Sequence, residues 1–449
     1  AYHLVTKNAA TVVTRIIMIG RERERENPFN EQISSQISRQ TADAMISSFY
    51  EKIVGGSPPA GKNEPKILCV GLVCLDIVHV CKHFPIEDSD ERCIEYRWQR
   101  GGNASNNCTV LSKLGSCTEF LGTLGSANHN WGFLREDMKK HNIDFSHCPT
   151  LDSVECPMST VLLSLRSTSR TIIHYNPNLP ELKLEDMEKL SLEDYSWIHF
   201  EGRNIPLVLS MMQYIESYNN GTRDGNGKLS EVPSKPPSSP ITISVELEKK
   251  NAELLDLLSY ADVAFISKDF AKSRGYGNMS ESMRNIGRDV KSGAVIICAW
   301  GDRGAMAITP DGTIVQSPAF SPPEIVDTLG AGDTFTAATL HYLNMVKLSR
   351  RENARISTDV AAASEETPIE IGGHSPAAPE IKVEIKRNPE IESLQRSQTE
   401  FIDRRVLQGA VTFACRVAGT KVGSRGYDEI ERAPEDLLSS SLPQRYVED

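Results

Sequence analysis

Short apolar runs alternate with segments of helical spacing along much of the chain. Residues 67–73 form a continuous apolar run, which is typical of a strand buried on both faces of a parallel sheet. Residues 103–114 carry apolar side chains at helical spacing and stop at Gly115, a residue that commonly ends a helix. Further apolar runs, each predicted to form a buried strand, occupy 197–200, 241–245, 263–266 and 294–298.

Helical spacing recurs between and after these runs, at 252–260, 280–290 and 336–344. Strands that alternate with helices predict an α/β fold with a central, mostly parallel sheet. Residues 92–100 and 158–175 instead alternate polar and apolar side chains, and the second region has a predicted hairpin turn at 167–169. We therefore expect a small sheet that projects from the body, with an exposed face that a ligand or another subunit covers.

Three segments lack this pattern. Residues 1–65 include an alternating charge run and predict a flexible extension, with a targeting role as the alternative. Residues 219–240 are rich in Gly, Pro and Ser and predict a long surface loop. Residues 346–400 have no aromatic side chain and an acidic bias, and predict a disordered insertion. The predicted core is therefore 66–345 plus 401–430, with projecting strands at about 77–102 and 156–176 and a tail at 431–449.

Composition narrows the class of protein. The chain has 449 residues, which by length alone suggests about three domains. Because three segments lack the alternating pattern, we expect a single folded core instead. The net charge of −11 disfavours nucleic-acid binding, and no apolar run is long enough to cross a membrane. The ten cysteines show no spacing typical of a zinc site. We expect reduced, mostly buried thiols and a cytoplasmic location.

The sequence DTLGAGDTF at 327–335 is the most informative stretch. Small residues at 330–332 precede a predicted helix, so backbone amides and the positive helix end can hold an anion such as a phosphoryl group. Asp333 then stands beside that anion, where it can accept a proton from an attacking hydroxyl. The alternative is a Gly-rich turn in which the Asp only caps the helix. No Walker A loop, protein-kinase motif, HExxH or GxSxG occurs.

These residues resemble a known family. DTLGAGDTF and GGNASN at 101–106 are similar to the two signatures of the PfkB (ribokinase-like) carbohydrate kinases. Within that family the chain resembles the ketohexokinases, and the similar blocks are ILCVGLVCLDIV, RWQRGGNASN, WIHFEGRN, VELEK, SKDFAK, CAWGDRGA and FACRVAGTKVG. The resemblance implies a three-layer α/β/α sandwich with a small β-sheet lid.

The resemblance also implies a role for individual residues. Asp333 matches the catalytic base, and Gly330, Ala331 and Gly332 match the anion hole. The positions that match fructose contacts are Asp76, expected just after the first strand, together with Asp88, Gly102, Asn103 and Asn106. Arg170 and Arg203 match positions near the phosphates and the sugar. The positions that match the nucleotide site are Lys268, Asp302, Gly304, Cys415, Ala418 and Gly419.

Several of these residues have a simpler interpretation. Asp88 alone reads as a solvated loop acid, Asn103 as a helix N-cap, and Arg170 as a solvated strand charge. Arg203 suits a structural salt bridge nearly as well as a phosphate contact. Cys415 and Ala418 are also explained by ordinary helix packing. Two departures stand out, namely Ser-Lys-Asp at 267–269 in place of the wider family's Asn-x-x-Glu, and Arg303, which reverses a charge.

The resemblance finally implies a reaction and its partners. ATP would phosphorylate D-fructose at the 1-hydroxyl, with Mg²⁺ on the ATP phosphates and a monovalent cation, K⁺, near the anion-hole loop. Two lids would interlock in a homodimer, with neither a nucleic acid nor a membrane as partner. The metal ligands are left unassigned. The alternatives are another sugar or nucleoside as substrate, and a catalytically weak family member that acts through interactions.

Overall fold

The computed structural model describes residues 64–167, 169–222, 239–363 and 397–432. These residues all belong to the unit Ala60–Asp449. The predicted extension 1–65 and the predicted tail 431–449 lie outside the described residues except for two residues each. Most of the predicted surface loop at 219–240 also lies outside them.

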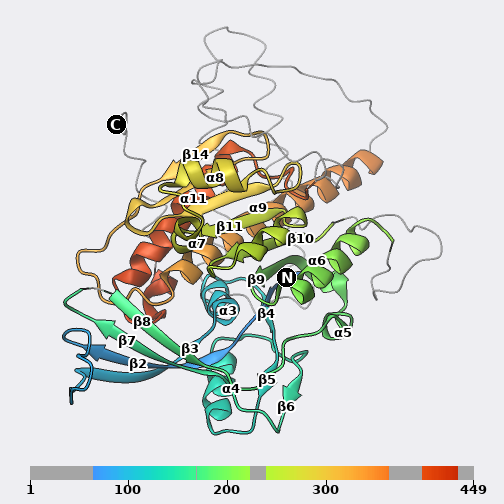
Figure 1. Ribbon diagram of the computed structural model, residues 1–449. Coiled ribbons are helices and arrows are strands. Elements are labelled where there is room, and N and C mark those ends of the chain that lie inside the picture. Colours follow the sequence, from blue (N-terminus) through green and yellow to red (C-terminus); the bar gives the residue numbers. More distant parts are fainter. Residues whose placement is uncertain (1–63, 168, 223–238, 364–396, 433–449) are drawn as a thin grey trace, which may run out of the picture. The chain divides into compact units, whose positions relative to one another are not determined.

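The central sheet has eight strands in the order β14-β13-β12-β11-β10-β9-β1-β4 (Figure 1). All neighbouring strands from β4 to β12 are parallel. Only the two pairs at the other edge, β12 with β13 and β13 with β14, are antiparallel. The sheet is therefore mostly parallel, as predicted. Its strands are β1 (Lys66–Val70), β4 (Thr118–Leu121), β9 (Tyr195–Glu201), β10 (Thr242–Leu247), β11 (Val263–Ser267), β12 (Val295–Ala299), β13 (Ala305–Ile308) and β14 (Ile314–Ser317).

Helices cover both faces of this sheet because successive side chains of each buried strand point to opposite faces. In β1, Ile67 and Cys69 pack against one layer, and Leu68 and Val70 pack toward the other. The first layer contains α3 (Asn103–Lys113), α4 (Asn130–Lys140), α9 (Ala331–Ala363) and α11 (Arg404–Val422). The second contains α5 (Leu184–Met187), α6 (Ile205–Asn219), η3 (Ala252–Ser259), α7 (Lys268–Ser273) and α8 (Met279–Ile286). The three-layer α/β/α prediction is confirmed.

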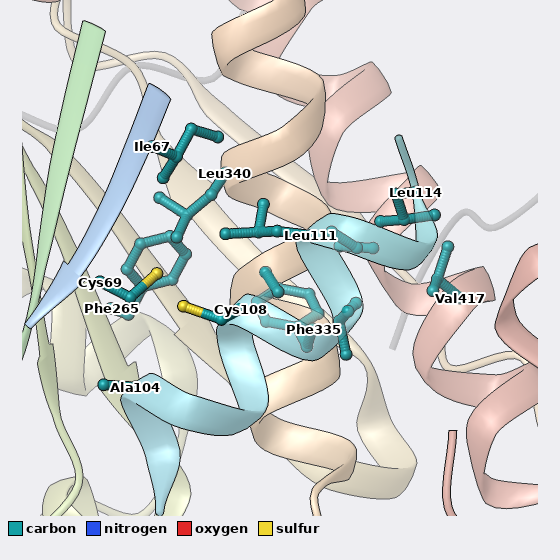
Figure 2. Close-up of a cluster of buried hydrophobic side chains, with 14 of the residues drawn as sticks. Ile67, Cys69, Ala104, Cys108, Leu111, Leu114, Phe265, Phe335, Leu340 and Val417 are labelled. Carbon is teal, nitrogen blue, oxygen red and sulfur yellow. The ribbon is translucent and has the colours of Figure 1, made fainter. Parts of the chain in front are cut away.

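The first layer is tied to the sheet by a dense apolar cluster. Figure 2 shows Cys69 from β1 and Cys108 from α3 inside it, next to Leu111 and Phe335. Eight of the ten cysteines are buried, which confirms the prediction that they are mostly buried, and all ten are free thiols. Of the helices that the structure describes, none is both long and apolar enough to cross a membrane.

A second sheet of four strands projects to one side of the central sheet, at the lower left of Figure 1. Its order is β3-β2-β7-β8, with strands β3 (Glu95–Gly101), β2 (Cys74–Cys81), β7 (Met158–Ser164) and β8 (Ser169–Tyr175). The middle pair is parallel and the outer pairs are antiparallel. The predicted projecting sheet is confirmed. The short elements are β5 (Leu124–Gly125), β6 (Thr150–Leu151), η2 (Leu192–Asp194), η4 (Gly301–Arg303) and η5 (Asp428–Arg432).

The apolar run at 67–73 is not one strand, which corrects the prediction. β1 ends at Val70, and β2 begins at Cys74 in the other sheet. Between them the backbone N–H of Leu72 donates to the buried carboxylate of Glu201, at 3.0 Å. A side chain cannot replace Gly71, because its Cβ would lie 2.6 Å from that carboxylate. Asp76 therefore lies within the projecting sheet rather than after the first central strand.

Helix α9 also differs from the prediction. It begins at Ala331 and continues to Ala363, although we expected a helix over 336–344 and a disordered insertion from 346. The continuation is anchored by Lys347, a buried side chain whose Nζ donates to the carbonyl oxygens of Ser196 and Pro240, at 2.8 and 2.7 Å. The predicted boundary at 345 is thus too early. Of the rest of the predicted insertion, residues 364–396 lie outside the described residues.

The projecting sheet has two different faces, which its register defines. The inner face carries Asp76, Val78, Arg97, Gln99, Ser159, Val161, Leu163, Arg170, Ile172 and His174. Val78, Val161 and Leu163 pack against Leu329, which belongs to the loop before α9. The outer face carries exposed large side chains at Tyr96, Trp98, Ile173 and Tyr175. The inner face is therefore turned toward the core, as expected for a lid.

Candidate active site

A cleft of about 690 Å³ opens at the carboxyl ends of the parallel strands β10, β11 and β12. Ligands of open α/β sheets gather at this edge. The start of α9, the end of α11 and one residue of the projecting sheet complete its walls. Eleven predicted site residues line it, namely Asn103, Arg170, Lys268, Asp302, Gly304, Ala331, Gly332, Asp333, Cys415, Ala418 and Gly419.

The N-terminus of α9 forms one wall of the cleft. The first bond of the i to i−4 type in this helix is donated by the Thr334 N–H to the carbonyl of Gly330, at 2.9 Å. Before that bond, the Ala331 N–H donates to the carbonyl of Thr328 at 3.3 Å, whereas the amides of Gly330, Gly332 and Asp333 donate to no other described residue. Such amides together with the helix dipole favour an anion. Gly330 has φ +77°, and a Cβ there would lie 2.1 Å from the hydroxyl of Tyr427. The backbone path into the anion site therefore requires glycine at 330.

Asp333 lies in the first turn of α9 and is held by Asn106 of α3, whose Nδ2 donates to its Oδ2 at 2.7 Å. Burial, reinforced by the nearby charges of Glu246 and Glu248, raises the pKa of Asp333 well above its usual range. The Oδ1 atom of Asn106 is buried and has no hydrogen-bond partner among the described residues. A carboxylate of raised pKa beside an anion site is suited to accept a proton from a bound hydroxyl.

Two further acids border the cleft, and sequence reasoning missed both. The Nδ2 atom of Asn103 donates to Glu246 at 2.7 Å and to Glu248 at 2.8 Å. Burial and the charge of Glu248 raise the pKa of Glu246 to about 8. Gly102 is the N-cap residue, so the alternative that Asn103 caps the helix is wrong. The signal for the two acids was present as a pair of Glu at the end of a predicted strand, in VELEK.

A buried ion-pair network fixes the loop before α9, and sequence reasoning missed this network too. The carboxylate of Asp327 accepts from Arg97 Nη2 of the projecting sheet at 2.9 Å. Lys421 Nζ lies 3.2 Å from the same carboxylate and donates to the Asp327 carbonyl at 2.8 Å. The Lys421 side chain is fully buried, and that of Asp327 is nearly so. The network joins the lid, the anion-site loop and the C-terminal end of α11.

The structure brings together most of the residues that the resemblance implies as sugar contacts. The carboxylate of Asp76 is buried and packs against Gly101, so closely that a Cβ at Gly101 would lie 2.2 Å from it. Burial raises the pKa of this carboxyl group. Gly102 follows with φ +96° and leads directly into α3. Asp76, Gly102, Asn103 and Asn106 therefore occupy one region at the start of α3.

Asp88 and Arg203 are not brought to the cleft. Asp88 is exposed in the connection between β2 and β3, and it does not line the cleft. Arg203 forms a two-point ion pair with Glu181, at 2.7 and 3.1 Å, and lies 3.7 Å from Glu201. Of the two interpretations of Arg203, a salt bridge and a phosphate contact, the structure therefore shows the salt bridge. Within the cleft, Lys268 Nζ lies 3.6 Å from Asp302.

Comparisons with known proteins place this geometry in context. The model of the family described as pfkB family carbohydrate kinase matches residues 64–368. A ketohexokinase of Mus musculus is 43% identical over 298 residues, which cover 66% of this chain and 95% of that protein. A ribokinase structure from Giardia lamblia has a TM-score of 0.59 at 16% identity, covering 84% of this chain and 98% of its own. An Arabidopsis thaliana ribokinase complexed with ribose and ATP has a TM-score of 0.53 at 15% identity, covering 84% and 100%.

Proposed function

This chain belongs to the pfkB family of carbohydrate kinases, and on that premise we propose that it transfers the γ-phosphoryl group of ATP to the 1-hydroxyl of D-fructose. The products are fructose 1-phosphate and ADP. The observation that carries the proposal is the hydrogen bond from the buried Asn106 to Asp333, which lines the large cleft at the N-terminus of α9. The choice of fructose is supported by the 43% identity to a ketohexokinase.

The proposed chemistry follows from the position of each group. The 1-hydroxyl oxygen attacks the γ-phosphorus while Asp333 takes its proton, and the bond between the γ-phosphorus and the ADP oxygen breaks. The amides of Gly330, Ala331 and Gly332 stabilise the negative charge on the transferring group. Asn106 orients the carboxylate of Asp333 through its 2.7 Å hydrogen bond. The protein forms no covalent bond to the phosphoryl group during such a transfer. Positioning of the substrates and stabilisation of charge therefore supply most of the rate acceleration.

The two ends of the cleft take different ligands in this proposal. Asp76, Gly102, Asn103 and Asn106 hold the sugar, and Arg170 lies at the phosphate end of the sugar. Asp88 is assigned as a sugar contact on the basis of the resemblance alone. Arg203 is assigned a supporting role near the site, because it forms ion pairs with Glu181 and Glu201. The nucleotide lies along Lys268, Asp302 and Gly304. Its flat adenine suits the small residues Cys415, Ala418 and Gly419.

The proposal assigns a role to Mg²⁺ but none to K⁺. Mg²⁺ in kinases is held mainly by substrate phosphates and by one or two carboxylates. Within the described residues no three His, Cys, Asp or Glu side chains form a metal cluster, but Glu246 and Glu248 border the cleft, which fits a Mg²⁺ that arrives with ATP. Bound Mg²⁺ would neutralise phosphate charge. Near the anion-site loop, Asp327 already pairs with Arg97 and Lys421, so its carboxylate does not fit a K⁺ site and no step is assigned to K⁺.

A panel of acceptors tests the proposed substrate. We expect the full chain with ATP and Mg²⁺ to produce ADP fastest with D-fructose, and more slowly with ribose and adenosine. Coupled detection of ADP measures each rate, with and without K⁺. A ranking of ribose or adenosine above fructose would assign another substrate to the same site. The absence of sugar-dependent ADP production would instead favour a catalytically weak family member that acts through interactions.

We also propose that two copies form a homodimer through the outer faces of their projecting sheets. Tyr96, Trp98, Ile173 and Tyr175 expose between 41% and 60% of their surface there, and a face of this kind needs a partner. We expect I173D to convert the dimer to a monomer, because a charge would then be buried in the contact. Light scattering coupled to size exclusion measures the mass. A wild-type mass equal to one chain would contradict the dimer.

The proposed compartment is the cytoplasm. All ten cysteines are free thiols, and the substrates of the proposed reaction are ATP and a free sugar. Free thiols persist where the surroundings are reducing. Imaging of the full-length protein in its own cells tests this location, and a signal confined to an organelle would contradict it.

A further inference from the structure

A row of polar side chains crosses all four strands of the projecting sheet. The register places Gln99 of β3 opposite Asp76 of β2, Asp76 opposite Ser159 of β7, and Ser159 opposite His174 of β8. Directly opposed residues share one face of a sheet. We call these four residues the polar row. It lies on the inner face, which Arg170 extends into the cleft.

The inner half of the polar row has hydrogen-bonding atoms that the protein does not use. Both amide atoms of Gln99 are buried and have no hydrogen-bond partner among the described residues. Asp76, next to Gln99, is 7% exposed, and its carboxylate lies over Gly101 at the start of α3. Unsatisfied buried polar atoms are costly, and a bound ligand commonly supplies the missing partners. The row therefore begins at the sugar side of the candidate active site.

The outer half of the polar row leads to His174. Its Nδ1 lies 3.1 Å from the hydroxyl oxygen of Ser159, and that serine lies 3.9 Å from the thiol of Cys74. The Nε2 atom of His174 makes no hydrogen bond to any other described residue. Partial burial of the ring and the nearby cations Arg203 and Lys249 lower the pKa of His174, although the residue is largely exposed. At neutral pH the ring is thus uncharged and presents one donor or acceptor at Nε2, directed away from Ser159.

Two charged groups of the core lie within electrostatic reach of His174. Arg203 follows β9 and Lys249 follows β10, and both act on the imidazole electrostatically. His174 therefore lies on the inner face of the projecting sheet, within electrostatic reach of charges that follow β9 and β10, whereas Asp333 lies at the start of α9. A sugar held by Asp76 with one hydroxyl at Asp333 would direct its remaining hydroxyls along the polar row.

We propose that His174 is a specificity-determining residue that contacts a hydroxyl of the sugar distant from the phosphorylated one. The proposal rests on the proposed sugar kinase function and deepens it. Ser159 acts as a positioning residue, because it fixes the imidazole from the neighbouring strand. The contact would discriminate between sugars that differ in one hydroxyl configuration, since a group that pairs with one epimer is left unpaired by the other.

Four variants test the proposal. H174L removes the ring's hydrogen bonds at an exposed position, H174Q keeps a donor and an acceptor, and S159A removes the positioning contact. T171V, on the outer face of the same strand, is the matched control. Steady-state kinetics are measured with fructose and with its epimers at carbons 3, 4 and 5, at saturating ATP, and then with ATP varied at saturating sugar.

We expect H174L to raise KM for the sugar about tenfold, the size of one lost hydrogen bond, with kcat and the KM for ATP unchanged. The preference of H174L for fructose over an epimer should become smaller for only one of the three epimers. H174Q should recover part of the loss, S159A should show an intermediate loss, and T171V should behave like wild type. An unchanged sugar KM in H174L, an equal loss in T171V, or a change confined to the KM for ATP would overturn the proposal.

Failure of the proposed function would look different. If the wild-type protein prefers another sugar, the fructose assignment fails, and the same four variants compared on that sugar still test His174. If no sugar is turned over, calorimetric titration of fructose into wild type and H174L decides the matter. Weaker binding to H174L supports the proposal, and equal or absent binding in both proteins contradicts it.

Discussion

Asp333→Asn is expected to reduce fructose-dependent ADP production by roughly 10²–10⁴-fold, the usual contribution of a general base. The amide is nearly the same size as the carboxylate, and the neighbouring Asn106 can still hydrogen-bond to its oxygen. The backbone amides of the anion site at 330–333 are untouched, so ATP should bind as tightly as to wild type. The loss should therefore appear in kcat and not in the affinity for the nucleotide.

The control for this variant is Asp256→Asn, which makes the same chemical change on the exposed side of η3, away from the cleft. Its turnover should match that of wild type. Rates come from the coupled ADP assay, and ATP affinity comes from calorimetry. Turnover of Asp333→Asn close to that of wild type would remove Asp333 as the base. Loss of ATP binding would show that the variant has disturbed the anion site instead.

Asp327→Ala is expected to lower the free energy of unfolding by about 3–5 kcal/mol, the cost of breaking a buried ion pair by removing one partner. Lys421 would keep its ammonium group in a fully buried position without the carboxylate that balances it. The Arg97 contact and the bond from the Leu329 N–H at 2.9 Å would also be lost. Because these bonds shape the loop before α9, kcat should fall as well.

Chemical denaturation of the full chain measures this free energy. Glu136→Ala is the matched control, since it breaks an ion pair with Lys139 on the exposed surface of α4 and should leave stability unchanged. Asp327→Asn keeps an acceptor but removes the charge, so its stability should fall between those of Asp327→Ala and wild type. Equal stabilities of Asp327→Ala and Glu136→Ala would show that the network does not hold the loop.

Much of the fold could be predicted because buried elements have a recognisable pattern of apolar residues in the sequence. The parallel strands β9 to β12 are short apolar runs, and the alternating segments became β3, β7 and β8 as predicted. The run at 67–73 failed because residues on both sides of the break are buried, so composition does not mark the change of sheet. The extension of α9 failed because its anchor, Lys347, is a buried lysine that composition assigns to the surface.

From the residues alone the candidate site was predictable only where one segment carries it, and the resemblance supplied the cleft residues from other segments. Asp333 and the small residues before it are contiguous, and the structure places them together at the start of α9. The pair of Arg203 with Glu181 joins different segments, and the network of Arg97, Asp327 and Lys421 joins residues more than 200 positions apart. Pairs of this kind depend on the tertiary arrangement and leave no local pattern. For the same reason the polar row became visible only from the strand register.

The position of the new phosphate on the product tests the central claim most directly. The full chain is incubated with ATP, Mg²⁺ and fructose labelled with ¹³C at carbon 1, and the product is examined by phosphorus NMR. Phosphorylation at the 1-hydroxyl predicts a product phosphorus signal split by coupling to the labelled carbon. A phosphorylated product without that coupling, or no phosphorylated fructose at all, would contradict the account.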